Sequence, residues 1–225
     1  MDEQMLKNLV LSFTSTLGNH DFRYSHLRQS SVLVPLMIKN KEVFVLLTKR
    51  SKNLRTHAGA VALPGGVKDF CEESDVDTAL REAEEEIGLQ RKDVTIVGVL
   101  PPLFASPRTT VVPVIGIINP SFTANVNKDE VDYVFFVALK DFRTKPIEKR
   151  EFNFYSRKLN IYYLSRELGD NTLIIYGLTI CICIAVAVIV DGGHSMLALF
   201  AACNYIDNQK INNTYTKRID YAPLI

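Results

Sequence analysis

The first third of the chain passes from a helical to a β pattern of apolar residues. Leu6, Val10 and Phe13 recur three or four positions apart among polar residues. That spacing predicts an amphipathic helix in the first half of residues 2–28, which we interpret as a leader. Two apolar runs rich in Val and Leu follow at residues 31–38 and 42–48, joined by a short polar turn. They predict a β-hairpin.

The middle of the chain alternates predicted strands with one helix. Residues 77–87 show helical spacing, with Asp77 as the expected N-cap and Gly88 as the expected C-cap. Further strands are expected at 94–100, 111–118 and 131–139, and one or two more within 151–163. This order predicts an α+β fold, an α/β/α sandwich around a mixed sheet.

Residues 173–190 form an apolar run of eighteen residues without a charge. That length meets the requirement for a membrane-spanning helix. The run contains Tyr176, Gly177, Thr179 and two cysteines, and no cluster of Lys or Arg flanks it. We therefore expect a helix buried against the sheet rather than a membrane span, although the many Ile and Val residues leave a strand open.

Composition narrows the class of protein. The chain has 225 residues, is 47% hydrophobic and carries 26 Lys and Arg against 25 Asp and Glu. This is ordinary globular usage, and the formal charge of +1 argues against a protein that neutralises nucleic-acid phosphates. We expect one main domain at 29–190, between the leader at 1–28 and a tail at 191–225.

The charge is unevenly spread, because nine carboxylates fall within residues 69–86. On a helix over 77–87, Glu82, Glu85 and Glu86 share the side opposite to the apolar stripe. Carboxylates at these spacings repel one another. A hard divalent cation such as Mg²⁺ or Mn²⁺ would offset that repulsion. A solvated acidic face without metal is the alternative.

The acidic helix follows a Pro-Gly-Gly step at 64–66 and contains the run R-E-A-E-E-E-I-G-L at 81–89. Together they resemble the Nudix box, G-x5-E-x7-R-E-U-x-E-E-x-G-U, in which U is aliphatic. The second half matches at every specified position. Glu73 keeps the spacing to Arg81, but the interval from Gly66 to Glu73 is one residue longer than the pattern.

Stretches outside the box are similar to the coenzyme A diphosphatase branch of that family. They are L-T-K-R-S at 47–51 and L-R-T-H-A-G at 54–59, with S-P-R at 106–108, E-V at 130–131, F-F-V at 135–137 and Y-G-L-T at 176–179. The resemblance covers about residues 30–190. It implies a Nudix-type sandwich with a loop–helix–loop catalytic motif, and a final helix that opens near Tyr176.

The resemblance also implies an activity and a set of site residues. The activity is metal-dependent hydrolysis of the pyrophosphate in coenzyme A and its thioesters, giving 3′,5′-ADP and 4′-phosphopantetheine or its acylated form. Glu82, Glu85 and Glu86 would bind Mg²⁺ or Mn²⁺, and Arg81 would orient them. Glu85, Glu86 and Glu130 are the expected catalytic carboxylates, with Glu86 or Glu130 as general base. The expected substrate-binding residues are Arg50, Arg55, His57, Gly65 and Gly66.

Three other functions stay open. The chain could hydrolyse another nucleoside diphosphate derivative, bind such a ligand without catalysis, or use residues 173–190 as a membrane anchor. The stretch at 50–59 argues against the first alternative, and the intact carboxylates of the box argue against the second. Peroxisomal location is expected from the branch, with the cytoplasm or mitochondrion as alternatives, and the sequence indicates no oligomeric state.

Overall fold

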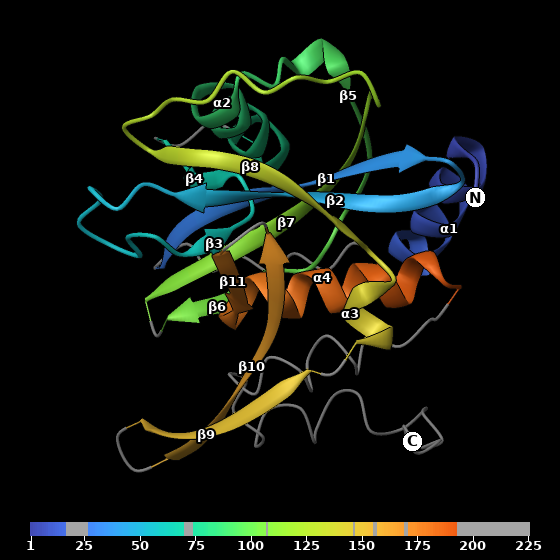
Figure 1. Ribbon diagram of the computed structural model, residues 1–225. Coiled ribbons are helices and arrows are strands. Elements are labelled where there is room, and N and C mark those ends of the chain that lie inside the picture. Colours follow the sequence, from blue (N-terminus) through green and yellow to red (C-terminus); the bar gives the residue numbers. More distant parts are fainter. Residues whose placement is uncertain are drawn as a thin grey trace.

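The fold is a large sheet with helices on both faces and a smaller sheet beyond one of them (Figure 1). It comes from a computed structural model that describes residues 1–16, 27–69, 74–106, 108–145, 147–154, 157–168 and 171–192. The elements are α1 (Glu3–Thr16), β1 (Arg28–Lys39), β2 (Glu42–Arg50), β3 (Val61–Ala62), β4 (Gly65–Val67), α2 (Asp75–Ile87), the 3₁₀ turn η1 (Arg91–Asp93), β5 (Val94–Val99), β6 (Leu103–Ser106), β7 (Thr109–Ile118), β8 (Val131–Ala138), α3 (Asp141–Thr144), β9 (Glu148–Phe154), β10 (Arg157–Leu168), β11 (Asn171–Tyr176) and α4 (Gly177–Val190).

The large sheet has eight strands and is mixed. Its main path is β3-β2-β1-β7-β5, and β4, β6 and β8 pair with β1, β7 and β2. β1 runs parallel to β7, while the other pairs are antiparallel. The predicted hairpin is confirmed: β1 and β2 are joined at Asn40 and Lys41, both with positive φ.

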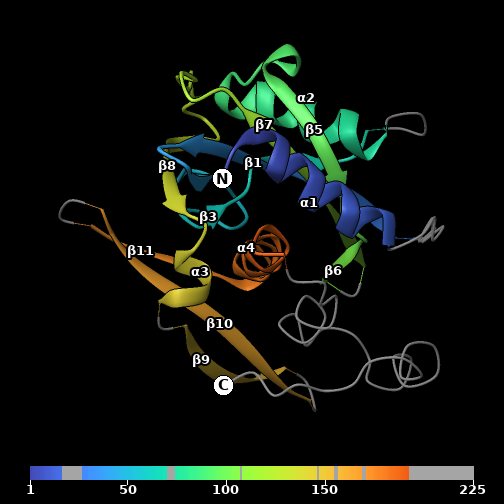
Figure 2. The same cartoon turned by 90° about the vertical axis from the view of Figure 1, so that its right-hand side faces the viewer.

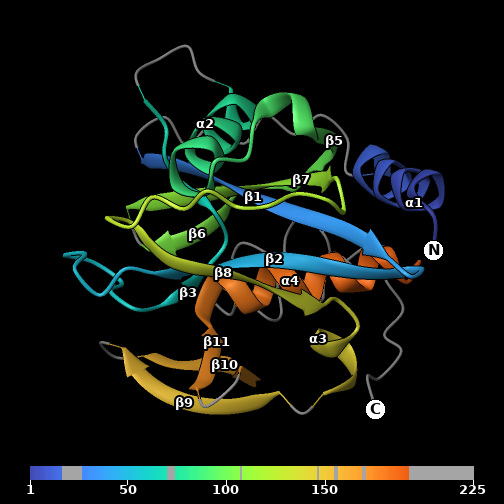
Figure 3. The same ribbon diagram turned by 45° about the horizontal axis from the view of Figure 1, so that its top comes forward.

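Side chains along the central strands point alternately to the two faces of the sheet, so the hydrophobic core has two layers. On β1, Leu33 and Met37 pack toward α2, whereas Val34 and Leu36 pack toward α4. A strand that is covered on both faces must be apolar at nearly every position. This explains the continuous apolar run of β1 and confirms the predicted sandwich, which Figure 3 shows with α2 above the large sheet and α4 below it.

The structure confirms the expected final helix that opens near Tyr176, and it divides the apolar run at 173–190 into two elements. Its first four residues belong to β11, and α4 begins only at Gly177 and has 14 residues. β11 pairs with β10, and β10 with β9, in a separate three-stranded sheet. The run is therefore a strand followed by a helix, and among the described residues no helix is both long enough and apolar enough to span a membrane.

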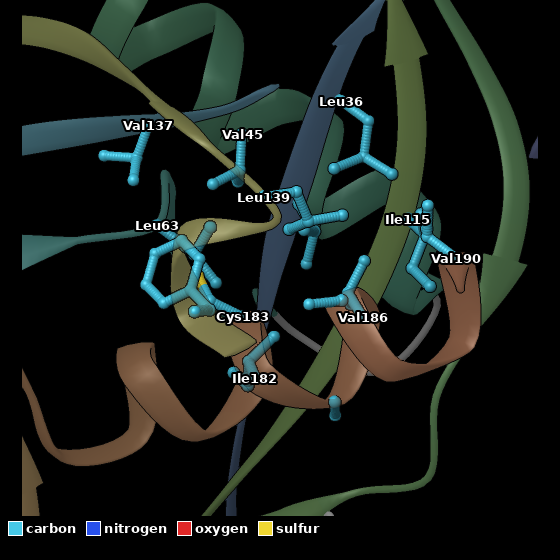
Figure 4. Close-up of a cluster of buried hydrophobic side chains, with 14 of the residues drawn as sticks. Leu36, Val45, Leu63, Ile115, Val137, Leu139, Ile182, Cys183, Val186 and Val190 are labelled. Atoms are coloured by element: carbon cyan, nitrogen blue, oxygen red, sulfur yellow. The ribbon is translucent and has the colours of Figure 1, made fainter. Parts of the chain in front are cut away.

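α4 lies between the two sheets, which explains why it is apolar on all sides (Figure 2). Ile182, Cys183 and Val186 belong to the same buried cluster as Leu36 and Val45 of the large sheet (Figure 4). Leu164, Leu173 and Ile175 of the smaller sheet join the same core. Nine of the 14 residues of α4 are buried, as the predicted burial of this segment requires.

The helix predicted near the N-terminus is present, whereas the predicted C-terminal tail lies outside the described residues. The predicted helix in the leader is confirmed as α1, whose Leu6, Val10 and Phe13 are buried in the core that contains α4. Val10 also packs against Gly98, where a Cβ would lie 2.7 Å from its methyl group. The division at 28 and 190 stays a prediction, and residues 193–225 lie outside the described part of the chain.

The ends of α2 give one correction and one confirmation. Ser74, rather than Asp77, is the N-cap, since its hydroxyl accepts a hydrogen bond from the backbone N–H of Asp77 at 3.0 Å. The helix therefore begins at Asp75, two residues earlier than predicted, and both aspartates lie in its first turn, where the helix dipole favours negative charge. Gly88 is the C-cap with φ 70, as predicted.

Candidate active site

α2 presents a buried carboxylate toward the loop that precedes it. The helix packs on the sheet through Leu80, Ala83 and Ile87. Glu86 is only 3% exposed, and its two oxygens face different donors. The backbone N–H of Gly65 donates to Oε2 at 3.3 Å, and Nη1 of Arg50 lies 3.4 Å from Oε1. The acidic side of α2 is therefore partly enclosed and not wholly open to solvent.

Gly65 and Gly66 make close approaches to their neighbours, and the one at Gly65 is to backbone that cannot give way. Gly65 has φ +153, and a Cβ there would lie 2.4 Å from the carbonyl oxygen of Ser31 on β1. At Gly66 a Cβ would lie 2.4 Å from the carboxylate of Glu82. Because β4 pairs with β1 through Ser31 and Gly66, the sheet itself brings this loop against α2. Both glycines therefore make room for the sheet and for a carboxylate.

Arg81 links the carboxylates of α2 to the loop. Its Nη1 lies 3.0 Å from Glu82 and 3.0 Å from Glu85, and its Nη2 donates to the carbonyl oxygen of Val67 at 3.1 Å. Glu82 is 16% exposed, whereas Glu85 is 54% exposed. The helix thus directs Glu82 and Glu86 inward, and Arg81 holds Glu85 at the rim.

Glu130 brings a third carboxylate to the site from a distant part of the chain. It directly precedes β8, and its carbonyl oxygen accepts a hydrogen bond from the backbone N–H of Ser51 at 2.8 Å. Its negative charge raises the pKa values of both Glu82 and Glu86. Residues separated by more than forty positions are therefore assembled into one acidic group.

Burial dominates the electrostatics of this group. It raises the pKa of Glu86 to about 8, although Arg50 and the N–H of Gly65 favour the charged form. Burial also raises the pKa of Glu82, with Arg81 opposing the shift and Glu85 and Glu130 adding to it. The positive charge present is therefore too small to balance the buried carboxylates.

The remaining predicted residues lie apart from this group. Arg55 and His57 are exposed on the loop between β2 and β3, where His57 has φ 53. Within the described ranges, neither side chain forms an ion pair or hydrogen bond with the three carboxylates. Glu73 and Pro107 lie outside the described residues, so their expected places in the motifs are untested.

Sequence reasoning assigned no role to Ser51, which the structure shows as the anchor of that loop. Ser51 is 2% exposed. Its carbonyl oxygen accepts hydrogen bonds from Leu54 and Gly59, and its own N–H is the donor to Glu130. A signal was present, since Ser51 belongs to the quoted L-T-K-R-S stretch, but a small polar residue predicts no contact by itself.

Comparison with known proteins gives the family. The profile of the NUDIX domain matches residues 27–159. The chain belongs to the Nudix family. Over 198 residues, 84% of each chain, it is 35% identical to peroxisomal coenzyme A diphosphatase NUDT7 of Mus musculus. Over 112 residues it is 44% identical to the uncharacterized Nudix hydrolase NudL of Escherichia fergusonii, matching 50% of this chain and 58% of that one. A solved Caenorhabditis elegans Ap4A hydrolase covers 51% of this chain with TM-score 0.43 and 19% identity.

Nudix hydrolases use divalent metal ions, and the residues at this site fit such an ion in their chemistry. Glu82, Glu85 and Glu86 carry carboxylate oxygens, the type of ligand that Mg²⁺ and Mn²⁺ prefer. Burial raises the pKa values of Glu82 and Glu86, and a bound cation would favour the charged form of both carboxylates. In the described part of the chain, no three acidic, His or Cys side chains already stand at ligating positions. The Nudix carboxylates therefore match a cation in type and charge, without a preassembled cage.

Proposed function

We propose that this Nudix hydrolase cleaves the pyrophosphate of coenzyme A and of coenzyme A thioesters. The observation that carries the proposal is the likeness to a coenzyme A diphosphatase over 84% of both chains. The L-T-K-R-S and L-R-T-H-A-G stretches support the same substrate, because both precede the Nudix box in this chain as they do in that branch.

The reaction is a displacement at phosphorus by water. The oxygen of water forms a bond to one phosphorus of the pyrophosphate, and the bond from that phosphorus to the bridging oxygen breaks. The bridging oxygen stays with the other phosphate, and the protons of water pass to a base and to solvent. The products are 3′,5′-ADP and 4′-phosphopantetheine, which keeps its acyl group when the substrate is a thioester.

The carboxylates of α2 are proposed to bind Mg²⁺ or Mn²⁺, with Glu82, Glu85 and Glu86 as ligands. A bound divalent ion neutralises the pyrophosphate and lowers the pKa of coordinated water. Arg81 orients two of these carboxylates through its 3.0 Å contacts with Glu82 and Glu85. Glu86 or Glu130 accepts the proton of the attacking water.

The exposed loop between β2 and β3 is proposed to meet the anionic substrate. Arg55 and His57 are open to solvent there, and a guanidinium matches phosphate geometry with two donors. Gly65 and Gly66 have close contacts with Ser31 and with a carboxylate of α2. Their proposed part in substrate binding is to keep the backbone near the reacting phosphates.

The decisive experiment is a product assay with purified full-length protein, coenzyme A and Mg²⁺ or Mn²⁺. We expect 3′,5′-ADP and 4′-phosphopantetheine in equal amounts, and a much slower reaction with Glu86→Gln. ADP-ribose serves as a second substrate in parallel. Turnover of ADP-ribose without any cleavage of coenzyme A would overturn the substrate assignment and leave a Nudix hydrolase of other nucleoside diphosphates.

Two further outcomes address the rival functions. A protein that binds coenzyme A but releases no product with either metal would be a binding protein. Equal rates for wild type and Glu86→Gln would remove Glu86 from the proposed metal site. For location we propose the peroxisome, because the mouse relative is named as peroxisomal, and imaging of the tagged full chain against peroxisomal, mitochondrial and cytoplasmic markers tests it.

A further inference from the structure

We infer that Arg50 is a positioning residue, which fixes the carboxylate of Glu86 for metal binding instead of receiving a phosphate of the substrate. The inference rests on the proposed role of Glu86 in the metal site. It differs from the expectation for Arg50 drawn from the sequence, which grouped this residue with Arg55 and His57 as substrate ligands.

The first support is the way in which the carboxylate of Glu86 is held. Oε2 faces the N–H of Gly65 at 3.3 Å, and Oε1 faces Nη1 of Arg50 at 3.4 Å. One donor belongs to β4 and the other to the last residue of β2. Each oxygen of the carboxylate faces one donor, and the two donors come from different strands, so the orientation of the carboxylate is fixed. Removing Arg50 would leave Oε1 without its donor.

The second support is that Arg50 is itself fixed and largely enclosed. Its backbone N–H donates to the carbonyl oxygen of Ala60 at 2.9 Å, and its side chain is 21% exposed. Its Nε is buried and has no acceptor among the described residues. A donor without solvent access cannot meet a ligand that arrives from solvent, so this face of the guanidinium is directed into the protein.

The third support is the next residue along the strand. Ser51 donates its N–H to the carbonyl oxygen of Glu130, so the end of β2 holds Glu86 through a side chain and Glu130 through the backbone. These two carboxylates come from α2 and from the start of β8, and β2 pairs with β8. The end of β2 is thus the structural link between the carboxylates of the site.

Manganese binding to the substrate-free protein tests the inference directly. The free Mn²⁺ signal in electron paramagnetic resonance gives the affinity for wild type, Arg50→Gln and a control, Lys49→Gln, which removes one positive charge from the adjacent position. We expect Arg50→Gln to weaken Mn²⁺ binding about tenfold or more, as loss of a residue that orients a ligand does. Lys49→Gln should leave the affinity unchanged.

A double-mutant cycle separates positioning from a general effect of charge or folding. If Arg50 acts through Glu86, Arg50→Gln should have little further effect on Mn²⁺ affinity in a Glu86→Gln background. The same loss in both backgrounds would overturn the inference. So would an unchanged Mn²⁺ affinity in Arg50→Gln together with a raised KM for coenzyme A, which is the behaviour of a phosphate ligand.

The proposed function and this inference can fail separately. Wild type that binds Mn²⁺ and shows the expected cycle, but does not cleave coenzyme A, would refute the substrate and retain the role of Arg50. Wild type that binds no Mn²⁺ would overturn the inference. If Arg50→Gln does not fold, Arg50→Lys takes its place: its shorter reach should weaken Mn²⁺ binding only when Glu86 is present, and unchanged affinity would overturn the inference.

Discussion

The helices α2 and α4 have similar lengths and lie on opposite faces of the same sheet, yet their sequences have little in common. α2 has one buried stripe and a charged side, whereas nine of the 14 residues of α4 are buried. α2 is covered by the sheet on one side only. α4 lies between the large sheet and the smaller β9–β11 sheet (Figure 2).

This difference shows that a helix can carry charged functional residues only if one of its sides is not packed against other elements. A helix between two sheets has no side available for polar chemistry, because a buried unpaired charge is strongly unfavourable. A helix with one free side can carry carboxylates, and strand β4, which contains Gly65 and Gly66, then encloses some of them. In this protein α4 packs in the hydrophobic core, and α2 supplies the carboxylates of the candidate active site.

The largest expected effect is on kcat, and it compares an inward glutamate of α2 with an exposed glutamate of the same helix. Glu82→Gln removes a carboxylate that faces the site and should lower kcat on the order of 10²–10³-fold, as loss of one electrostatic group at a reacting centre does. Glu84→Gln changes an exposed residue of the same helix and should leave kcat within about twofold of wild type. Steady-state kinetics with coenzyme A measures both. Similar losses in the two variants would contradict the assignment of the inward side.

The next effect concerns stability and would test whether α4 is covered on opposite sides. Ile180 and Ile182 are both 0% exposed and stand two positions apart, which places them on opposite sides of a helix. Each substitution to Ala should lower the free energy of unfolding by about 2–5 kcal/mol in urea titrations. In α2, Glu84→Ala should change it by less than about 0.5 kcal/mol. A negligible cost at either isoleucine would break the comparison.

A third effect follows from the raised pKa of Glu86. The folded-state pKa of about 8 exceeds the ordinary value of 4.5, so the folded protein binds the additional proton between these pH values. Stability of the metal-free protein should therefore fall as pH rises from 4.5 to 8, and Glu86→Gln should be more stable than wild type at pH 8 by on the order of 4 kcal/mol. Thermal unfolding at pH 4.5 and pH 8 measures this. An equal difference at both pH values would refute the electrostatic cause.

The smallest expected effect is on stability, and it concerns the residues that precede α2 and α4. Ser74 accepts the N–H of Asp77, and Ser74→Ala should cost about 1 kcal/mol of stability. Tyr176 at the start of α4 makes no side-chain cap hydrogen bond, so Tyr176→Phe should change stability by less than about 0.5 kcal/mol. Urea titrations of both variants give the comparison, and a larger loss for Tyr176→Phe would reverse it.

Much of the local structure could be predicted from the sequence because it depends on neighbouring residues. The C-cap at Gly88, the β1–β2 turn and the helix α1 all follow from short patterns, and all are confirmed. The N-cap was misplaced because Asp77 and Ser74 are both good capping residues, and only the backbone geometry selects between them. Within 173–190 the apolar composition alone does not separate strand from helix, and the Y-G-L-T stretch marks the start of the helix.

In the candidate active site too, local sequence patterns predict some features, and others depend on tertiary contacts. Helical spacing indicated that Glu82 and Glu86 share a side of α2, and the structure places both inward. The burial of Glu86 was not predictable, because Gly65 and Arg50 reach it from two strands. The parts that the sequence assigned to Arg55, His57 and Glu130 in catalysis or substrate binding stay predictions.

The sequence by itself determined the Nudix box, the mixed α+β architecture and the carboxylate-rich helix, since each depends on residues close together in the chain. Only the tertiary structure decided which carboxylates are enclosed, what Arg50 contacts and why α4 carries no charge. Those properties depend on which elements cover which face: β1 pairs with β4 and brings Gly65 against Glu86, and the β9–β11 sheet covers the far side of α4.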